Sequence, residues 1–213
     1  MPDVHVPKLG EHSGKSVWHI ALEVVLISAG VFLGLMGEQW RERLHQRELA
    51  EQALRRFRSE IDENRKAVAD VKDYHATLLT QLDAQFKLRA EKRSGEGIQF
   101  HGVRPANFDH SAWDLAIATQ SLAFVDPDIA LELSKLYNVQ NFVAELNRGF
   151  IQAMYVSPPA VDTKNETTFF GAVLLYYGDM SVYEPRLLTM YDEALEKIDK
   201  ALGEKPAGAT RSK

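Results

Sequence analysis

An apolar run near the N-terminus, LEVVLISAGVFLGLMGEQW over residues 22–40, constrains the fold of this chain more than any other feature. Within residues 17–37 the only strongly polar side chains are those of His19 and Glu23. A helix of this length rises about 30 Å, which matches the hydrocarbon thickness of a bilayer. Trp18 and Trp40 bracket the run, and indole rings prefer the lipid headgroup level. The run therefore predicts an N-terminal tail over 1–16 and a transmembrane helix over 17–38, with Trp18 and Trp40 as membrane-interface anchors.

Two alternatives to a membrane span compete for this run. The strictly uncharged stretch covers only residues 24–37, a length that also suits a buried helix in a soluble core. A cleaved signal peptide fits poorly, because the apolar run continues past Ser28 and Gly30 and a basic leader is nearly absent. Glu23 lies five residues from Trp18, near the predicted interface, where tilt or protonation lowers the cost of a carboxylate in lipid. The span is the favoured interpretation.

Small residues give the predicted span one distinctive face. On a helix, Glu23, Gly30, Gly34 and Gly37 share a side. The spacing Gly30-x-x-x-Gly34 lets two helix backbones approach closely in lipid, where packing supplies the attraction. We therefore predict a helix–helix interface made by Gly30, Gly34, Gly37 and Glu23, with either a second copy of the chain or another membrane protein. The alternative is that glycine is simply common in membrane spans.

The orientation of the span stays open. Lysine and arginine near its two ends favour a cytoplasmic C-terminal side, because six arginines follow the span within residues 41–58 and only two lysines precede it. However, these arginines alternate with glutamates on a predicted solvated helix, and such a pattern stabilises a helix whatever the topology.

A long stalk helix is predicted after the span, because no glycine or proline interrupts residues 38–94. Asn64 and His75 fill two gaps in its apolar stripe, at positions where a polar group either forms a hydrogen bond to another helix or fixes the register of packing. The stripe has helical, nearly heptad spacing. Its members are Leu54, Phe57, Ile61, Val68, Val71, Leu78, Leu82 and Phe86.

The remainder of the chain predicts further helices around this stalk. After the glycines at 95 and 97, residues 98–103 alternate loosely like a short strand or an ordered loop. Helical spacing resumes at Ser111, and a second helix is predicted to start at Asp126-Pro127 and to run to about Tyr155.

The C-terminal third is less regular. The two prolines at 158–159 end the second helix, and a polar loop is expected through 165–168. The run 169–177 fits a buried helix or a strand equally well. A final helix is predicted over 187–202, stopped by Gly203, with a disordered tail over 204–213. The predicted fold is mostly α, with a single N-terminal transmembrane helix continuing into a helical bundle over 39–203.

The residues around the span resemble those of a known family. The pattern consists of Glu23-Val-Val-Leu-Ile-Ser-Ala-Gly-Val-Phe-Leu-Gly-Leu followed by Trp40, with Ser111-Ala-Trp and Leu136-Tyr as a second block. It resembles an uncharacterised family of bacterial single-pass membrane proteins, although Met36-Gly-Glu-Gln departs from that family's asparagine-containing ending. The resemblance implies an anchor in the bacterial inner membrane and a helical extramembrane domain, and it implies no activity.

Composition and motifs exclude several classes of chemistry. The net charge of −5 with mixed signs gives no footprint for binding nucleic acid. The absence of cysteine excludes disulfides, thiolate metal sites and cysteine nucleophiles. Common hydrolase and nucleotide-binding signatures are also missing. We therefore expect no cofactor, no bound metal and no enzymatic activity.

One loop carries groups that could perform chemistry if they met. His101, Asp109, His110 and Asp114 are loop-borne or nearly so, and such groups can bind a metal or act as acid and base. The favoured alternative is a solvated loop in which Asp109 caps the following helix. Three further histidines have a seven-residue spacing, which is not a metal-ligand pattern. They are His5, His12 and His19.

The favoured function is protein–protein interaction or assembly at a membrane, with lipid and either the chain itself or another membrane protein as partners. The second hypothesis is a membrane-tethered sensor or ligand-binding domain, because aromatic residues gather in one region. They are Phe169, Phe170, Tyr176, Tyr177 and Tyr183. Such residues more often belong to a core.

Overall fold

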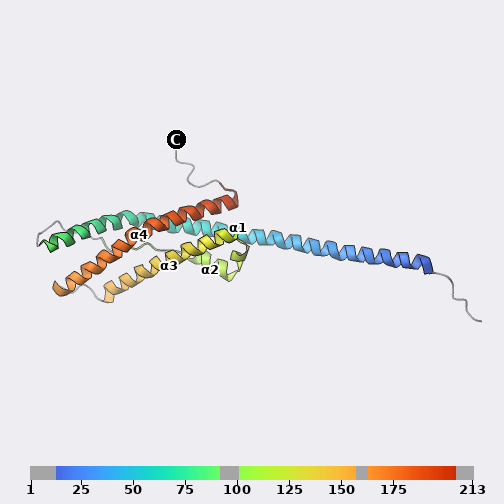
Figure 1. Cartoon of the computed structure of the whole chain (residues 1–213), viewed down its shortest axis with the longest axis horizontal. Coiled ribbons are helices and arrows are strands. Elements are labelled where there is room, and N and C mark those ends of the chain that lie inside the picture. Colours follow the sequence, from blue (N-terminus) through green and yellow to red (C-terminus); the bar gives the residue numbers. More distant parts are fainter. Residues whose placement is uncertain (1–12, 92–100, 157–162, 205–213) are drawn as a thin grey trace, which may run out of the picture. The chain divides into compact units, whose positions relative to one another are not determined.

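The computed structural model describes residues 13–91, 101–156 and 163–204. Its helices are α1 (Ser13–Ala90), α2 (Ser111–Ala118), the 3₁₀ helix η1 (Ser121–Phe124), α3 (Pro127–Val156) and α4 (Thr163–Leu202), as Figure 1 shows. No strand occurs in these described ranges, so residues 101–103 do not form the strand that the alternation allowed. The predicted mostly α fold, with an apolar N-terminal helix that continues into a stalk, is confirmed.

The chain divides into two compact units, Met1–Arg47 and Glu48–Lys213, and the first contains the apolar part of α1. Every large apolar side chain from Val17 to Trp40 is between 51% and 73% exposed. The most apolar window of this helix has a mean hydropathy of 2.2, and none of that window is buried by described residues. No described part of its own unit buries this helix, which favours a membrane span over a buried core helix. This helix is long and apolar enough to cross a membrane.

In the second unit, the predicted stripe of the stalk forms the core. Phe57, Ile61 and Val68 are fully buried, and the other members as far as Leu82 are buried too. Phe86 is the exception, at 45% exposed. Apart from Phe86, the predicted core of the stalk is confirmed.

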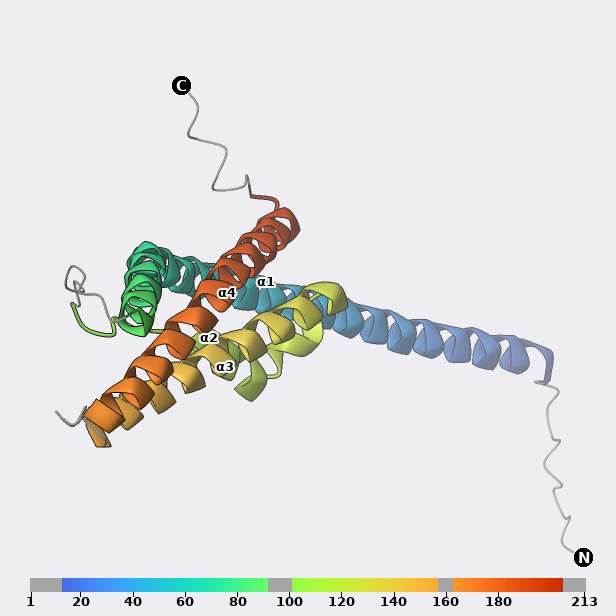
Figure 2. The same ribbon diagram turned by 60° about the vertical axis from the view of Figure 1, so that its left-hand side comes forward.

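α3 begins and ends where the sequence predicts. The Asp126 carboxylate accepts hydrogen bonds from the backbone N–H groups of Asp128 (2.9 Å) and Ile129 (3.4 Å), which caps the helix. The helix ends at Val156, immediately before residues 157–162, which lie outside the described residues. α3 and α4 lie side by side in both views (Figure 1, Figure 2).

The prediction of a polar loop over 165–168 and a separate final helix over 187–202 is wrong, because both belong to one helix, α4. It runs without a break from Thr163 to Leu202 and passes through Pro185, so the run 169–177 is helical. Proline has no N–H and normally ends a helix. Here the helix is tightly packed on both sides of Pro185, and this packing outweighs the backbone hydrogen bond that the proline cannot make. The side chains that are at most 1% exposed are Tyr177, Met180, Leu187 and Tyr191.

α4 ends at Leu202, immediately before the glycine that was predicted to stop it. Gly203 has φ +69°, a conformation that suits glycine, and the Glu204 N–H donates to the Asp199 carbonyl at 2.9 Å. Glu204 also accepts from the Arg55 guanidinium at 2.5 Å, so this residue belongs with the bundle. The rest of the predicted disordered tail over 204–213, which is residues 205–213, lies outside the described residues.

Candidate functional site: a polar core around a non-helical segment

A non-helical segment, residues 101–110, runs against helices of the second unit and is here called the strap. Its carbonyl groups accept bonds from side chains, because no helix or strand supplies partners for them. The Tyr74 hydroxyl donates to Gly102 O (2.7 Å) and the Asn147 amide to Ala106 O (3.3 Å). The Asn64 amide both donates to Asp109 O (2.9 Å) and accepts from Asp109 N–H (2.8 Å). Side chains from α1 and α3 therefore fix the strap.

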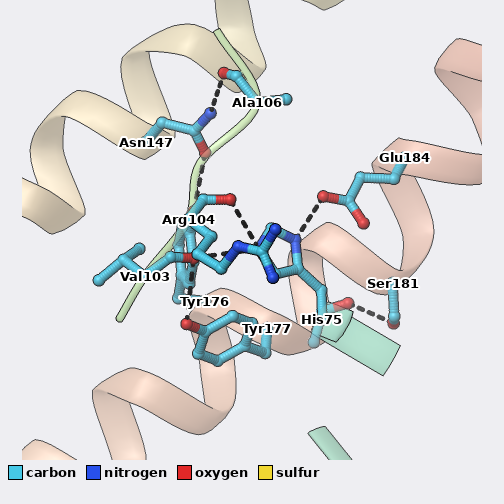
Figure 3. Close-up of polar contacts among 10 residues, drawn as sticks. His75, Val103, Arg104, Ala106, Asn147, Tyr176, Tyr177, Ser181 and Glu184 are labelled. Atoms are coloured by element: carbon cyan, nitrogen blue, oxygen red, sulfur yellow. Dashed lines mark hydrogen bonds and ion pairs between the residues drawn. The ribbon is translucent and has the colours of Figure 1, made fainter. Parts of the chain in front are cut away.

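The centre of this arrangement is a buried pair, His75 of α1 and Glu184 of α4, drawn in Figure 3. Their side chains are 1% and 2% exposed, and His75 Nδ1 lies 2.6 Å from Glu184 Oε1. The other ring nitrogen, Nε2, lies 3.0 Å from Val103 O and 3.1 Å from Arg104 O. Carbonyl oxygens only accept, so Nε2 carries a hydrogen and donates it to the strap.

This geometry also determines what lies between the two side chains. With Nε2 protonated, one further proton must lie between Nδ1 and Oε1, since two lone pairs at 2.6 Å would repel each other. The pair is thus neutral as a whole, whichever atom holds that proton. The second carboxyl oxygen, Glu184 Oε2, is buried and has no hydrogen-bond partner among the described residues. Such a group is costly to bury, so the site depends strongly on its one good bond.

The strap is bent sharply where His75 holds it. Gly102 (φ +91°) and Arg104 (φ +47°) both have positive φ and flank Val103. For a residue other than glycine this conformation costs about 1–3 kcal/mol. The Val103 carbonyl accepts from Tyr177 as well as from His75, and the Arg104 guanidinium lies 5.1 Å from the centre of the Tyr74 ring. These contacts offset the strain of the bend.

Glu60 forms a second polar centre, between α1 and the start of α2. It is 6% exposed, and its Oε2 accepts from the Ala112 N–H (2.7 Å) and the Ser111 hydroxyl (2.9 Å). A carboxylate at a helix N-terminus is favourable because unpaired N–H groups and the helix dipole meet there. Its Oε1 accepts from Tyr137 at 2.6 Å. Burial, and then this bond to Glu60, raise the pKa of Tyr137 above its ordinary value.

Gln140 links the three long helices through the same core. Its Oε1 accepts from Asn64 of α1 (3.1 Å) and from the hydroxyl of Tyr191 of α4 (2.8 Å), while its Nε2 donates to Asp109 O (3.1 Å). Burial raises the pKa of Tyr191, so its phenol stays a hydrogen-bond donor. Asn64 and His75 both form hydrogen bonds to other helices, which is one of the two roles predicted for them.

The candidate chemical cluster of the loop does not come together. His110 Nδ1 lies 3.1 Å from Asp114 Oδ1, whereas the backbone of His101 donates to Tyr74 and that of Asp109 bonds Asn64. In the part of the chain that the structure describes, no group of three potential ligands could hold a metal ion. The expected helix cap by Asp109 is also wrong: the capping position is His110, which forms no side-chain cap bond, and Glu60 takes that role.

The three glycines of the predicted helix–helix interface lie on an open part of α1. A side chain added at Gly30, Gly34 or Gly37 would meet nothing within 4 Å, so no described part of the chain packs there. Glu23 lies on the same face by helical spacing. Of the spaced histidines, His5 and His12 lie outside the described residues and His19 is part of α1.

The aromatic group behind the sensor hypothesis lies mainly in the core. Tyr177 is 0% and Tyr176 5% exposed, and burial raises the pKa of both phenols. Phe170 and Tyr183 pack partly buried against the core, while the Phe169 side chain lies outside the described part. Within this group, Tyr176 also lines an open groove between α3 and α4.

Comparisons of the chain with family models, with curated proteins and with solved structures gave no match. The structure itself defines the class: its described residues form a mostly α protein with one helix able to cross a membrane and a helical bundle with a buried polar core.

Proposed function

We propose that this chain is a single-pass protein of the bacterial inner membrane whose helical domain serves as a protein–protein interaction or assembly module. The observation that carries the proposal is the uncovered apolar part of α1, in which each large side chain from Val17 to Trp40 is at least half exposed. Fully removing one such side chain from water is worth about 1.5–3 kcal/mol. The hydrocarbon of a lipid bilayer can bury a helix of this length and hydropathy.

The bundle supports an interaction role more than a catalytic one. The buried side chains of Glu60, Gln140 and His75 bond to the strap, to the start of α2 or to other helices, so their polar atoms are already used within the fold. The arginines after the span also have structural partners, such as Glu38 for Arg41 (2.8 Å) and Asp199 for Arg58 (2.5 Å). For this reason the arginine count alone does not assign the topology.

Fractionation tests the membrane assignment. Membranes from cells expressing the full chain are washed with carbonate, and spheroplasts are treated with protease from outside. We expect the chain to stay in the pellet. Digestion of the bundle would place it in the periplasm, and protection would place it in the cytoplasm. Release by carbonate would refute the membrane anchor.

Self-association through the glycine face is the second part of the proposal. Replacing Gly30 and Gly34 by leucine puts bulk into the open face and should abolish the signal in a membrane two-hybrid assay. The matched control replaces Ala21 and Ser28 by leucine, because helical spacing puts these small residues on the opposite face. An equal effect of both pairs, or of neither, would contradict an interface at the glycines.

A further inference from the structure

A groove of about 380 Å³ lies between the C-terminal half of α3 and the N-terminal half of α4. Leu146, Phe150 and Tyr176 form its apolar part, and the rings of Phe150 and Tyr176 stack at 4.0 Å. Phe142, Glu145, Gly149 and Asp179 complete the lining. We call it the α3–α4 groove. It is open to solvent along both helices, unlike a small-molecule pocket, which encloses most of its ligand.

The surface around the groove is apolar and unfilled. Phe142 is 45% exposed, and Leu175 and Val182, on the same face of α4 as Asp179, are 73% and 64% exposed. Gly149 stands inside α3, where glycine costs about 1 kcal/mol relative to alanine. A side chain there would meet nothing within 4 Å, so no close packing within the described chain requires this glycine. Exposed apolar surface with polar groups at its edge is typical of an interaction site.

Charge indicates what kind of partner fits. Glu145 and Asp179 line the groove from its two helices, and the structure shows no ion pair or hydrogen bond from either carboxylate to a described residue. Further along α4 the situation differs, because Asp192 pairs with Arg65 (2.6 Å) and Asp199 with Arg58 (2.5 Å). A second copy docked symmetrically on this face would bring the groove carboxylates toward their own equivalents, which is unfavourable.

From the apolar floor, the open shape and these two carboxylates, we propose that the α3–α4 groove docks an amphipathic helix of a partner protein with a lysine or arginine beside an apolar anchor residue. The anchor fills the space above Gly149, and the base pairs with Glu145 and Asp179. Helices commonly bind in this manner to grooves between two helices. This inference rests on the proposed interaction role and names the surface and the partner chemistry.

The test uses the full chain in nanodiscs of zwitterionic lipid and two labelled synthetic peptides of equal length. Both peptides have leucines at helical spacing, one with lysines and the other with glutamates on the flanks. Fluorescence anisotropy measures binding, and empty nanodiscs correct for lipid binding. We expect the lysine peptide to bind, more weakly as salt rises, and the glutamate peptide not to bind.

Variants locate the binding. Gly149→Leu fills the groove and favours helix, so the fold should survive, which circular dichroism checks. We expect it, and the double variant Glu145→Gln with Asp179→Asn, each to weaken binding about tenfold or more. The matched controls are Asn141→Leu on α3 and Glu196→Gln on α4, two exposed positions that do not line the groove, which should change binding less than about twofold.

Three results would overturn the proposal. They are no binding of the lysine peptide, equal binding of both peptides, and binding that Gly149→Leu leaves unchanged. A drop in molecular mass by light scattering on Gly149→Leu, without peptide, would instead assign the groove to a second copy and would also overturn it. If the groove fails while the Gly30 and Gly34 variants still abolish self-association, the assembly role stands. If the chain washes off membranes while the peptide binds as expected, the anchor fails and the groove stands.

Discussion

The bond between His75 and Glu184 makes a quantitative prediction about stability. Replacing Glu184 by leucine leaves His75 Nδ1 buried, at a site where both side chains are at most 2% exposed. A buried group that loses its partner costs about 1–3 kcal/mol when neutral. Breaking a buried ion pair costs about 3–5 kcal/mol. We therefore expect Glu184→Leu to lower the free energy of unfolding by an amount within these ranges.

Glu184→Gln is the informative comparison. Its amide N–H can donate to Nδ1 of a neutral histidine, while Nε2 still donates to Val103 and Arg104, so the cost should be about 1 kcal/mol or less. The double variant His75→Leu with Glu184→Leu should cost less than the sum of the two single changes, because the two groups form one unit. Asp192→Leu is the control: it removes an exposed pair with Arg65 and should cost about 1 kcal/mol or less.

The assay is native-state hydrogen exchange by mass spectrometry on the full chain in mild detergent, with peptides that cover the strap and α4. The Asp109 N–H, which donates to Asn64, reports the strap directly. Faster exchange should appear in both segments of Glu184→Leu, because the pair links them. The reasoning is refuted if glutamine and leucine at position 184 are equally destabilising, or if the single effects simply add in the double variant.

Three further outcomes follow from the polar core and the helix ends. Glu60→Ala should lower the free energy of unfolding by about 2–3 kcal/mol, because three hydrogen-bond donors lose a charged acceptor. The thermal midpoint in a circular dichroism melt should fall accordingly, and a fall no larger than that caused by replacing an exposed glutamate with alanine would contradict this. Gly203→Ala should lower the free energy of unfolding in urea by about 1 kcal/mol, because residue 203 has a φ of +69°. An unchanged free energy of unfolding would contradict this reasoning. In an ultraviolet titration, four buried tyrosines should ionise only as the fold opens. Since their folded-state pKa values are raised, stability should fall as the pH rises above about 10, and smooth ionisation of all tyrosines with the helices intact would contradict the burial. The four are Tyr137, Tyr176, Tyr177 and Tyr191.

Local signals made much of the fold predictable. The apolar run, the unbroken stalk and its buried stripe follow from composition and spacing, which act over a few helical turns. The start of α3 follows from Asp126 and Pro127, and the end of α4 from Gly203. Where a prediction failed, a longer-range effect was responsible. Proline ends a helix by local rules, and only the buried residues around Pro185 carry α4 through it.

The polar core was only half visible in the sequence. Asn64 and His75 were identifiable because they interrupt an apolar stripe. Glu60 and Glu184 look like ordinary surface charges, and their burial depends on partners far along the chain. Glu184 is 109 residues from His75, and Glu60 is 77 residues from Tyr137. No pattern within a single sequence indicates such pairings, because helix periodicity specifies a face and not the residue that covers it.

The way the strap is held also determines when it can fold. During synthesis the strap leaves the ribosome after α1 and before α3 and α4. Its donors lie on both sides of it in the sequence, so those from α1 are present early and those from α3 and α4 only later. The early group is Asn64, Tyr74 and His75, and the late group is Gln140, Asn147 and Tyr177. At the bend itself, Tyr74 and His75 of α1 are present before the strap emerges, whereas the bond from Tyr177 to Val103 and the bond of His75 to Glu184 form only after α4 has been made. The complete set of bonds to the strap therefore requires the whole chain up to α4, because contacts between distant parts of the sequence form late.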